Sequence, residues 1–202
     1  MFTAPKRHVI RSDKQLRVLV SAARQEIVDV MADLGTVSVA EIAAALRRPA
    51  DALYFHLRTL QRAGLVKKAG SRRRGGRLEA LYRTISPELF LHYEPASAMN
   101  RRAVTAIVSS MLRLGVRDFR RAFGRSEVVV SGPQRELWAW RKAARLTLPQ
   151  VAALNRQIQD LAHSMSQPQG KGRLFGVTVL LVPLDRPGRS RKERPRAQRR
   201  RK

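Results

Sequence analysis

Apolar positions in the first third of the chain recur at intervals of three and four residues, the spacing of a helix with one buried face. They predict a helix over residues 13–34 that a glycine ends, and a short second helix that begins after Ser38. A glutamate three residues after Ser38 completes the pattern of a capping box. Pro49 fits the first turn of a third helix over about residues 49–63. This order of helices is typical of a helix-turn-helix.

After Gly64 the pattern changes from helical spacing to short extended runs. Residues 65–68 and 78–85 predict two strands, and residues 69–77, rich in glycine and arginine, predict a long basic tip between them. A hairpin that directly follows the third helix is a wing. We therefore predict a winged helix-turn-helix domain over residues 12–86.

Three short motifs in this region are Ser38-Val39-Ala40-Glu41-Ile42-Ala43, Leu53-Tyr54-Phe55-His56-Leu57-Arg58-Thr59-Leu60 and Ala63-Gly64-Leu65-Val66. Together they resemble the ArsR-like winged helix-turn-helix transcriptional regulators. The resemblance covers roughly residues 15–86 and implies a DNA-binding fold, with an unidentified small-molecule effector as a further expectation. The metal-sensing members of that family use cysteine-containing sites, and this chain has no cysteine, so metal sensing is not implied.

The second half of the chain also mixes helical and strand patterns. Beyond a hinge marked by Pro87 and Pro95, residues 97–123 predict a long helix with an apolar stripe, and Thr147 is placed to cap another. Strands are predicted at residues 127–130, 136–146 and 177–182, which with the second helix would form a βαβ unit. The fold class expected is thus α+β: the winged domain joined to a small C-terminal α/β domain, residues 97–184, for dimerisation or effector binding. Residues 185–202 predict a disordered basic tail.

Charge narrows the choice of partner. The 202 residues contain 41 Lys and Arg against 15 Asp and Glu, a formal net charge of +26, which favours binding to a polyanion. No apolar run approaches the roughly 20 residues of a membrane span, and the first residues do not form a basic amphipathic or lipidated anchor, so no membrane partner is expected. Double-stranded DNA is the partner we predict, in the cytoplasm and associated with the nucleoid.

The third helix carries the candidate base-reading side chains. Leu53, Leu57 and Leu60 share the face expected to be buried, which turns the opposite face toward the major groove. The alternatives are that the aromatic residue covers a neighbouring helix, that the arginines are only solvated, and that the aspartate serves the helix dipole. The predicted DNA-binding residues of this face are Asp51, Tyr54, Phe55, Arg58 and Arg62.

The wing carries the candidate phosphate contacts, since its cations follow one another without an intervening acid. A solvated charge run is the alternative interpretation. The residues are Lys67, Lys68, Arg72, Arg73, Arg74 and Arg77.

Other residues with useful chemistry receive plainer interpretations. We expect His56 to be packed and hydrogen-bonded inside the motif. His92 and His163 lack partners at ligand spacing, so neither a metal nor another cofactor is expected. Trp138 and Trp140 alternate along a predicted strand and belong to a core, a dimer interface or a ligand pocket.

No catalytic motif is present, so we expect no enzyme. The sequence predicts a homodimeric, sequence-specific transcription regulator whose long helix hides its apolar stripe against a partner chain. The alternative is a structural protein that compacts DNA or binds RNA without sequence preference.

Overall fold

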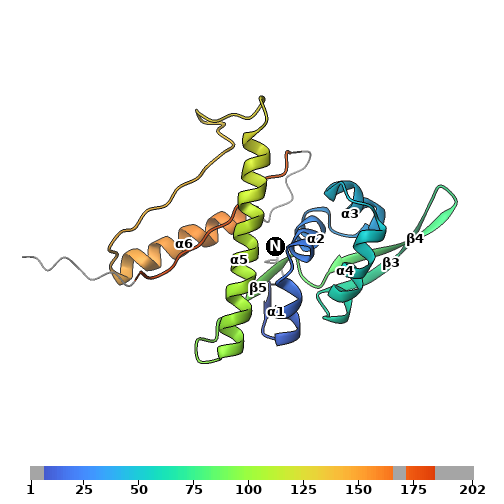
Figure 1. Cartoon of the computed structure of the whole chain (residues 1–202), viewed down its shortest axis with the longest axis horizontal. Coiled ribbons are helices and arrows are strands. Elements are labelled where there is room, and N and C mark those ends of the chain that lie inside the picture. Colours follow the sequence, from blue (N-terminus) through green and yellow to red (C-terminus); the bar gives the residue numbers. More distant parts are fainter. Residues whose placement is uncertain (1–6, 166–171, 185–202) are drawn as a thin grey trace, which may run out of the picture.

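The computed structural model describes residues 7–165 and 172–184. The fold is α+β, with an N-terminal winged helix-turn-helix followed by a helical C-terminal region (Figure 1). The predicted basic tail, residues 185–202, lies outside the described residues.

Two helices, not one, occupy residues 13–34. Helix α1 spans Asp13–Leu19 and α2 spans Ala22–Leu34, so the prediction of a single helix is wrong. Ser21 between them has an extended backbone, with φ −81° and ψ 121°, and its carbonyl accepts hydrogen bonds from the first turn of α2. The break changes the direction of the chain, so that the apolar faces of both helices reach the same core.

Helices α3, Val39–Leu46, and α4, Asp51–Arg62, form the helix-turn-helix with α2. The capping box predicted at Ser38 is confirmed: its Oγ accepts from the Glu41 amide at 3.4 Å, and the Ser38 amide donates to Glu41 Oε2 at 2.8 Å. Helix α4 begins two residues later than predicted: its first residue is Asp51, and Ala50 is its N-cap residue. Gly35 ends α2 with φ 76°, as the sequence predicts.

The wing is a hairpin of β3, Val66–Arg74, and β4, Arg77–Thr84. Strand β2, Val37–Ser38, adds to β4, so the antiparallel sheet has the order β2-β4-β3. Only Gly75 and Gly76 turn the chain, with φ values of 54° and 77° that favour glycine. The loop predicted over residues 69–77 is therefore wrong in extent, since all four of its arginines lie on paired strands.

A second, two-stranded sheet was not predicted. Strand β1, Arg7–Ile10, pairs in parallel with β5, Glu88–Leu91, which lies where the sequence indicates only a hinge. This pairing joins the start of the described chain to the segment that leaves the wing.

The core of the winged domain extends into the C-terminal region. Helix α5, Ala98–Phe123, lies where a long helix is predicted over residues 97–123; Ser97 caps it, and it buries Val104 and Ile107 against α1 and α2. The first half of its apolar stripe is therefore covered by its own chain, which corrects the expectation that a partner covers all of it.

Beyond α5 the predicted βαβ unit does not form. Helix α6, Leu148–Met165, is present where the sequence places it, but it buries no residue. The strands predicted at residues 127–130, 136–146 and 177–182 are wrong, because these stretches are not hydrogen-bonded to one another as a sheet. Trp138 and Trp140 are 72% and 79% exposed and lie outside the core that the described residues form. Within the described ranges, no helix combines the length and the hydropathy needed to cross a membrane.

Candidate nucleic-acid interface

Helix α4 presents two opposite faces, and the sequence assigns both correctly. Leu53, Leu57 and Leu60 are at most 2% exposed. The aromatic side chains on the other side are open to solvent, with Phe55 69% exposed, so Phe55 does not cover a neighbouring helix. The solvent-facing set contains each residue predicted on this helix: Asp51, Tyr54, Phe55, Arg58 and Arg62.

Local contacts fix the orientation of that face. Gly64 ends α4 with φ 72°, and the amide of Leu65 donates to the carbonyl of Leu60 at 3.0 Å. Leu65 is fully buried, and Val66 after it begins β3. The C-terminus of α4 is thereby joined through one tight turn to the wing, so the helix and the hairpin keep a fixed relation.

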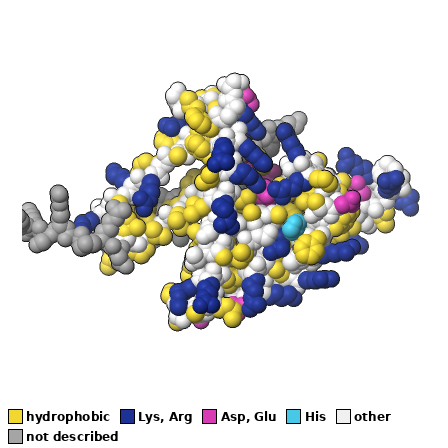
Figure 2. All heavy atoms as spheres, in the orientation of Figure 1, with side chains coloured by type: hydrophobic (Ala, Val, Ile, Leu, Met, Phe, Trp, Pro, Cys, Tyr) yellow, Lys and Arg dark blue, Asp and Glu magenta, His cyan; other side chains and the backbone are white. Residues whose placement is uncertain are grey.

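The wing displays most of its cations without intrachain partners. Figure 2 shows Lys and Arg side chains gathered over the hairpin and beside α4. Lys67, Lys68, Arg73, Arg74 and Arg77 are exposed, and among the described residues none of them forms an ion pair. Their positive charge is available to an external anion.

Arg72 differs from its neighbours on the wing. Its guanidinium contacts Glu41 Oε1 at 2.7 Å and Glu79 Oε2 at 3.3 Å, which ties β3 to the start of α3 and to β4. The carboxylate of Glu41 raises the pKa of Arg72. The pKa of Glu41 is in turn lowered, first by the hydrogen bond from the Ser38 amide and then by Arg72. Arg72 thus positions the wing, in addition to the phosphate contact predicted for it.

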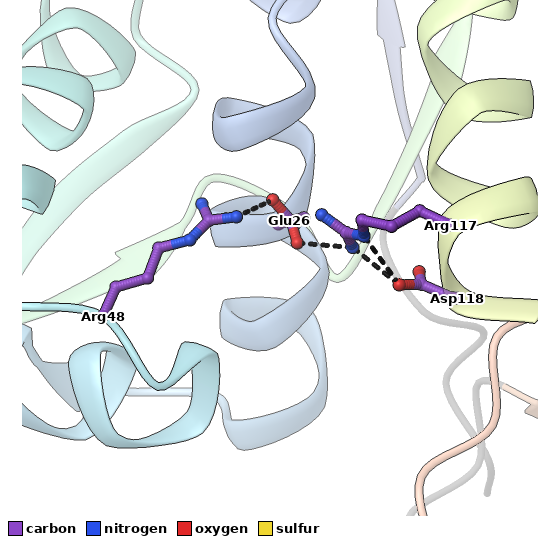
Figure 3. Close-up of polar contacts among 4 residues, drawn as sticks. All are labelled: Glu26, Arg48, Arg117 and Asp118. Atoms are coloured by element: carbon purple, nitrogen blue, oxygen red, sulfur yellow. Dashed lines mark hydrogen bonds and ion pairs between the residues drawn. The ribbon is translucent and has the colours of Figure 1, made fainter. Parts of the chain in front are cut away.

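A second set of charges joins the helix-turn-helix to α5 (Figure 3). Glu26 of α2 accepts from Arg48, in the turn between α3 and α4, at 2.7 Å and from Arg117 of α5 at 2.6 Å. Arg117 also contacts Asp118 at 2.7 Å. Burial raises the pKa of Glu26, but the hydrogen bonds from Arg117 and Arg48 outweigh it, and the net pKa lies below the ordinary value.

This cluster was not found from the sequence. Glu26 is an acid beside a buried isoleucine on an amphipathic helix, which is a weak signal, and Arg117 follows it by 91 positions in the chain. Such long-range pairs become visible only once the packing of α5 is known.

His56 is half-buried on the shoulder of α4, in edge-to-face contact with Phe55, with ring centroids 5.6 Å apart. Burial lowers the pKa of His56, and the charges of Arg24 and Arg48 lower it further. The packing agrees with the sequence analysis, but the predicted hydrogen bonding is not complete, because the enclosed Nδ1 has no partner in the described structure.

Residues 15–69 match the family model of a helix-turn-helix domain. The match covers α1 to the first part of β3. Among solved structures, the chain is similar to the transcriptional regulator HlyU from Vibrio vulnificus CMCP6, with 24% identity over 46% of this chain and 82% of that chain and a TM-score of 0.29. No curated protein matches the sequence.

Metal ligands do not gather in the part of the chain that the structure describes. No group of three or more His, Asp or Glu side chains there is arranged to hold an ion.

Proposed function

We propose that this protein is a sequence-specific, double-stranded DNA-binding transcription regulator. The observation that carries the proposal is the outward face of α4, where aromatic, arginine and aspartate side chains stand in solvent above a fully buried leucine face. Arginine recognises guanine through O6 and N7, and aromatic groups pack on thymine methyls, so this face fits the major groove. The matched helix-turn-helix model is consistent with that use of α4.

The wing would contact the backbone or the minor groove beside the same site. Its five unpaired cations supply sequence-independent affinity, and the closing glycines allow close approach to a phosphate. The groove-facing helix then selects the sequence, and the wing strengthens binding to every sequence.

A homodimer would place two α4 helices in successive major grooves, about one turn of DNA apart, on a pseudo-palindromic site. Its support is the second half of α5, where Leu112, Val116, Phe119 and Phe123 lie on one side of the helix. They are between 37% and 65% exposed. These residues remain available to a partner, unlike Val104 and Ile107.

Footprinting on genomic DNA fragments at about 150 mM salt tests the proposal. We expect protection of discrete sites, because regulators exceed their own non-specific binding by about 10³ or more. Uniform protection along every fragment would instead support the DNA-compacting alternative, and equal competition by structured RNA would support the RNA-binding one.

A pair of arginine variants separates base reading from phosphate binding. Arg58→Ala should reduce discrimination between the preferred site and a mutated site by about 1–3 kcal/mol. Arg73→Ala, which removes the same charge from the wing, should weaken both DNAs alike and make the log–log salt slope shallower by about 0.9. If both variants changed discrimination equally, the division of roles between α4 and the wing would be wrong.

A further inference from the structure

The last described segment, residues 174–184, has an unusual combination of properties for this chain. It contains no charged residue, although the protein carries a net charge of +26. Its large hydrophobic side chains are between 43% and 70% exposed. We call it the apolar segment; its sequence is Leu174-Phe175-Gly176-Val177-Thr178-Val179-Leu180-Leu181-Val182-Pro183-Leu184.

The backbone of the apolar segment is unpaired as well. It belongs to no helix or strand, and no hydrogen bond joins its amides or carbonyls to another described residue. A β-branched run that is neither paired nor covered is a template for another strand. The segment therefore has the side chains of a strand, and its backbone pairs with no other strand among residues 7–165 and 172–184.

In the view of Figure 1 the segment crosses α5. A Cβ atom placed on Gly115 of α5 would meet Thr178 Oγ1 at 3.7 Å, and Arg173 just before the segment contacts Glu136 Oε1 at 2.6 Å. Helix α6 does not bury the segment, since the large hydrophobic side chains of the segment remain between 43% and 70% exposed. The segment consequently adjoins the exposed half of the α5 stripe.

We propose that residues 174–182 form a β-strand that pairs antiparallel with the same residues of a second copy of this chain. The inference rests on the dimer of the proposed function and specifies where that dimer is joined. A two-fold axis brings identical segments together in opposite directions, which is the geometry of an antiparallel pair.

Charge argues for a second copy at this position. Two chains of +26 repel each other, so their contact is least unfavourable where neither presents a cation. The apolar segment meets that condition, and the apolar stripe of α5 beside it extends the same contact. Nucleic acid does not fit the segment, because nothing on it can neutralise phosphate.

The absence of cysteine from the chain allows a direct test by cross-linking. Single variants Leu174→Cys, Thr178→Cys and Val182→Cys place a thiol along one face of the strand. When residues 174–182 pair antiparallel with themselves, the two-fold axis passes through Thr178, so under mild oxidation we expect disulfide-linked dimers with the highest yield for Thr178→Cys and a lower yield at the other two positions. Leu34→Cys is the matched control, because Leu34 and Val182 are 48% and 49% exposed, and it should not cross-link.

Sedimentation of the full chain provides the second measurement. The double variant Val179→Asp/Leu181→Asp should raise the dimer dissociation constant at least tenfold, whereas Leu34→Asp should leave it unchanged. Circular dichroism of each variant should retain the wild-type helical signal, because the segment contributes nothing to the buried core of the winged domain.

The outcomes distinguish this inference from the proposed function. A dimer that resists the double variant but dissociates with Val116→Asp would overturn the strand pairing and leave a dimer through α5. A wild-type chain that stays monomeric at micromolar concentration would overturn both forms of the dimer, while footprinting would still decide DNA binding. Uniform cross-linking at all three segment positions and at the control would also overturn the pairing. So would thiols in the segment that do not cross-link but are protected from oxidation by anionic phosphatidylglycerol vesicles.

Discussion

Arg72 and Arg73 are neighbours on β3 with the same charge, but their surroundings give them different roles. Arg73 extends into solvent, whereas Arg72 contacts Glu41 and Glu79. A cation already neutralised by two carboxylates releases fewer counterions when DNA binds than a free one does. The sequence places both residues in one basic run and cannot separate them.

Arg72→Ala should therefore loosen the wing more than it weakens the electrostatic attraction to DNA. We expect faster hydrogen exchange at the amides of β4 near Glu79, and a change in the log–log salt slope clearly smaller than that of Arg73→Ala. Salt titration of DNA binding and amide exchange measure the two effects. Equal salt slopes for the two variants, with unchanged exchange, would show that Arg72 contacts phosphate instead of positioning the wing.

Ser38 stabilises the first turn of α3 through its capping box. Ser38→Ala should lower the free energy of unfolding by about 1 kcal/mol, since the Glu41 amide loses its acceptor in a nearly buried position. Urea denaturation followed by circular dichroism measures this loss. Ser71→Ala on the exposed surface of the wing is the control, and a loss of similar size there would contradict the assignment to the cap.

At the scale of elements, the sequence predicts what depends on neighbours along the chain. The cap at Ser38, the leucine face of α4 and the stop at Gly35 are local signals, and each is present in the structure. The break at Ser21 was missed because the apolar spacing continues through it. The sequence marks this break only by Ser21, a residue type that often precedes a helix, and Ser21 is the N-cap residue of α2 in the structure.

Strands were harder to predict because they need partners. The pairing of β1 with β5 links residues 81 positions apart, and no local pattern indicates it. Conversely, residues 177–182 have the composition of a strand but pair with no strand in the described part of the chain. A β-branched sequence pattern indicates that a segment is able to form a strand. Which strand it pairs with depends on the fold or on the assembly.

The attachment of α5 to the helix-turn-helix depends on Glu26, which leads to a pH-dependent prediction. Glu26→Gln should lower the free energy of unfolding by about 1–2 kcal/mol at pH 7, because Arg48 and Arg117 lose a charged acceptor. Asp118→Asn is the control with a smaller expected effect, since the side chain of Asp118 is 58% exposed.

The sign of the pH dependence follows from the lowered pKa of Glu26. The unfolded chain binds a proton near the ordinary value of about 4.3, before the folded chain does, so the folded state loses this stabilisation as the pH falls through the lower, folded pKa. The difference between wild type and Glu26→Gln should shrink as the pH falls below about 5. Between pH 7 and 5 it also depends on Asp29, whose pKa is raised to about 6 by burial and then by the charges of Glu26 and Asp118, because Asp29 no longer repels Glu26 once it is protonated. Chemical denaturation at several pH values measures the difference, and a difference that grew below pH 5 would contradict the network.

At the scale of the whole molecule, charge acts on folding and on binding in opposite directions. The excess of 41 Lys and Arg over 15 acids makes the folded chain repel itself. The described ion pairs, including those of Glu26 and Arg72, offset this repulsion at only a few positions. Most cations of the described residues therefore have no acidic partner there and can bind an external anion, such as the DNA of the proposed function.

Salt should consequently stabilise the free protein while it weakens the complex. Raising NaCl from about 50 to 500 mM shortens the screening length from over 10 Å to below 5 Å, so self-repulsion decreases and Tm should rise by several degrees. Over the same range the affinity for DNA should fall with a log–log slope near −5, the value for about six neutralised phosphates. Differential scanning calorimetry and fluorescence anisotropy measure the two trends on the same preparation. A Tm that falls with salt would mean that the ion pairs of Glu26 and Arg72 outweigh the repulsion, and a slope near zero would mean that the wing and α4 do not meet phosphate.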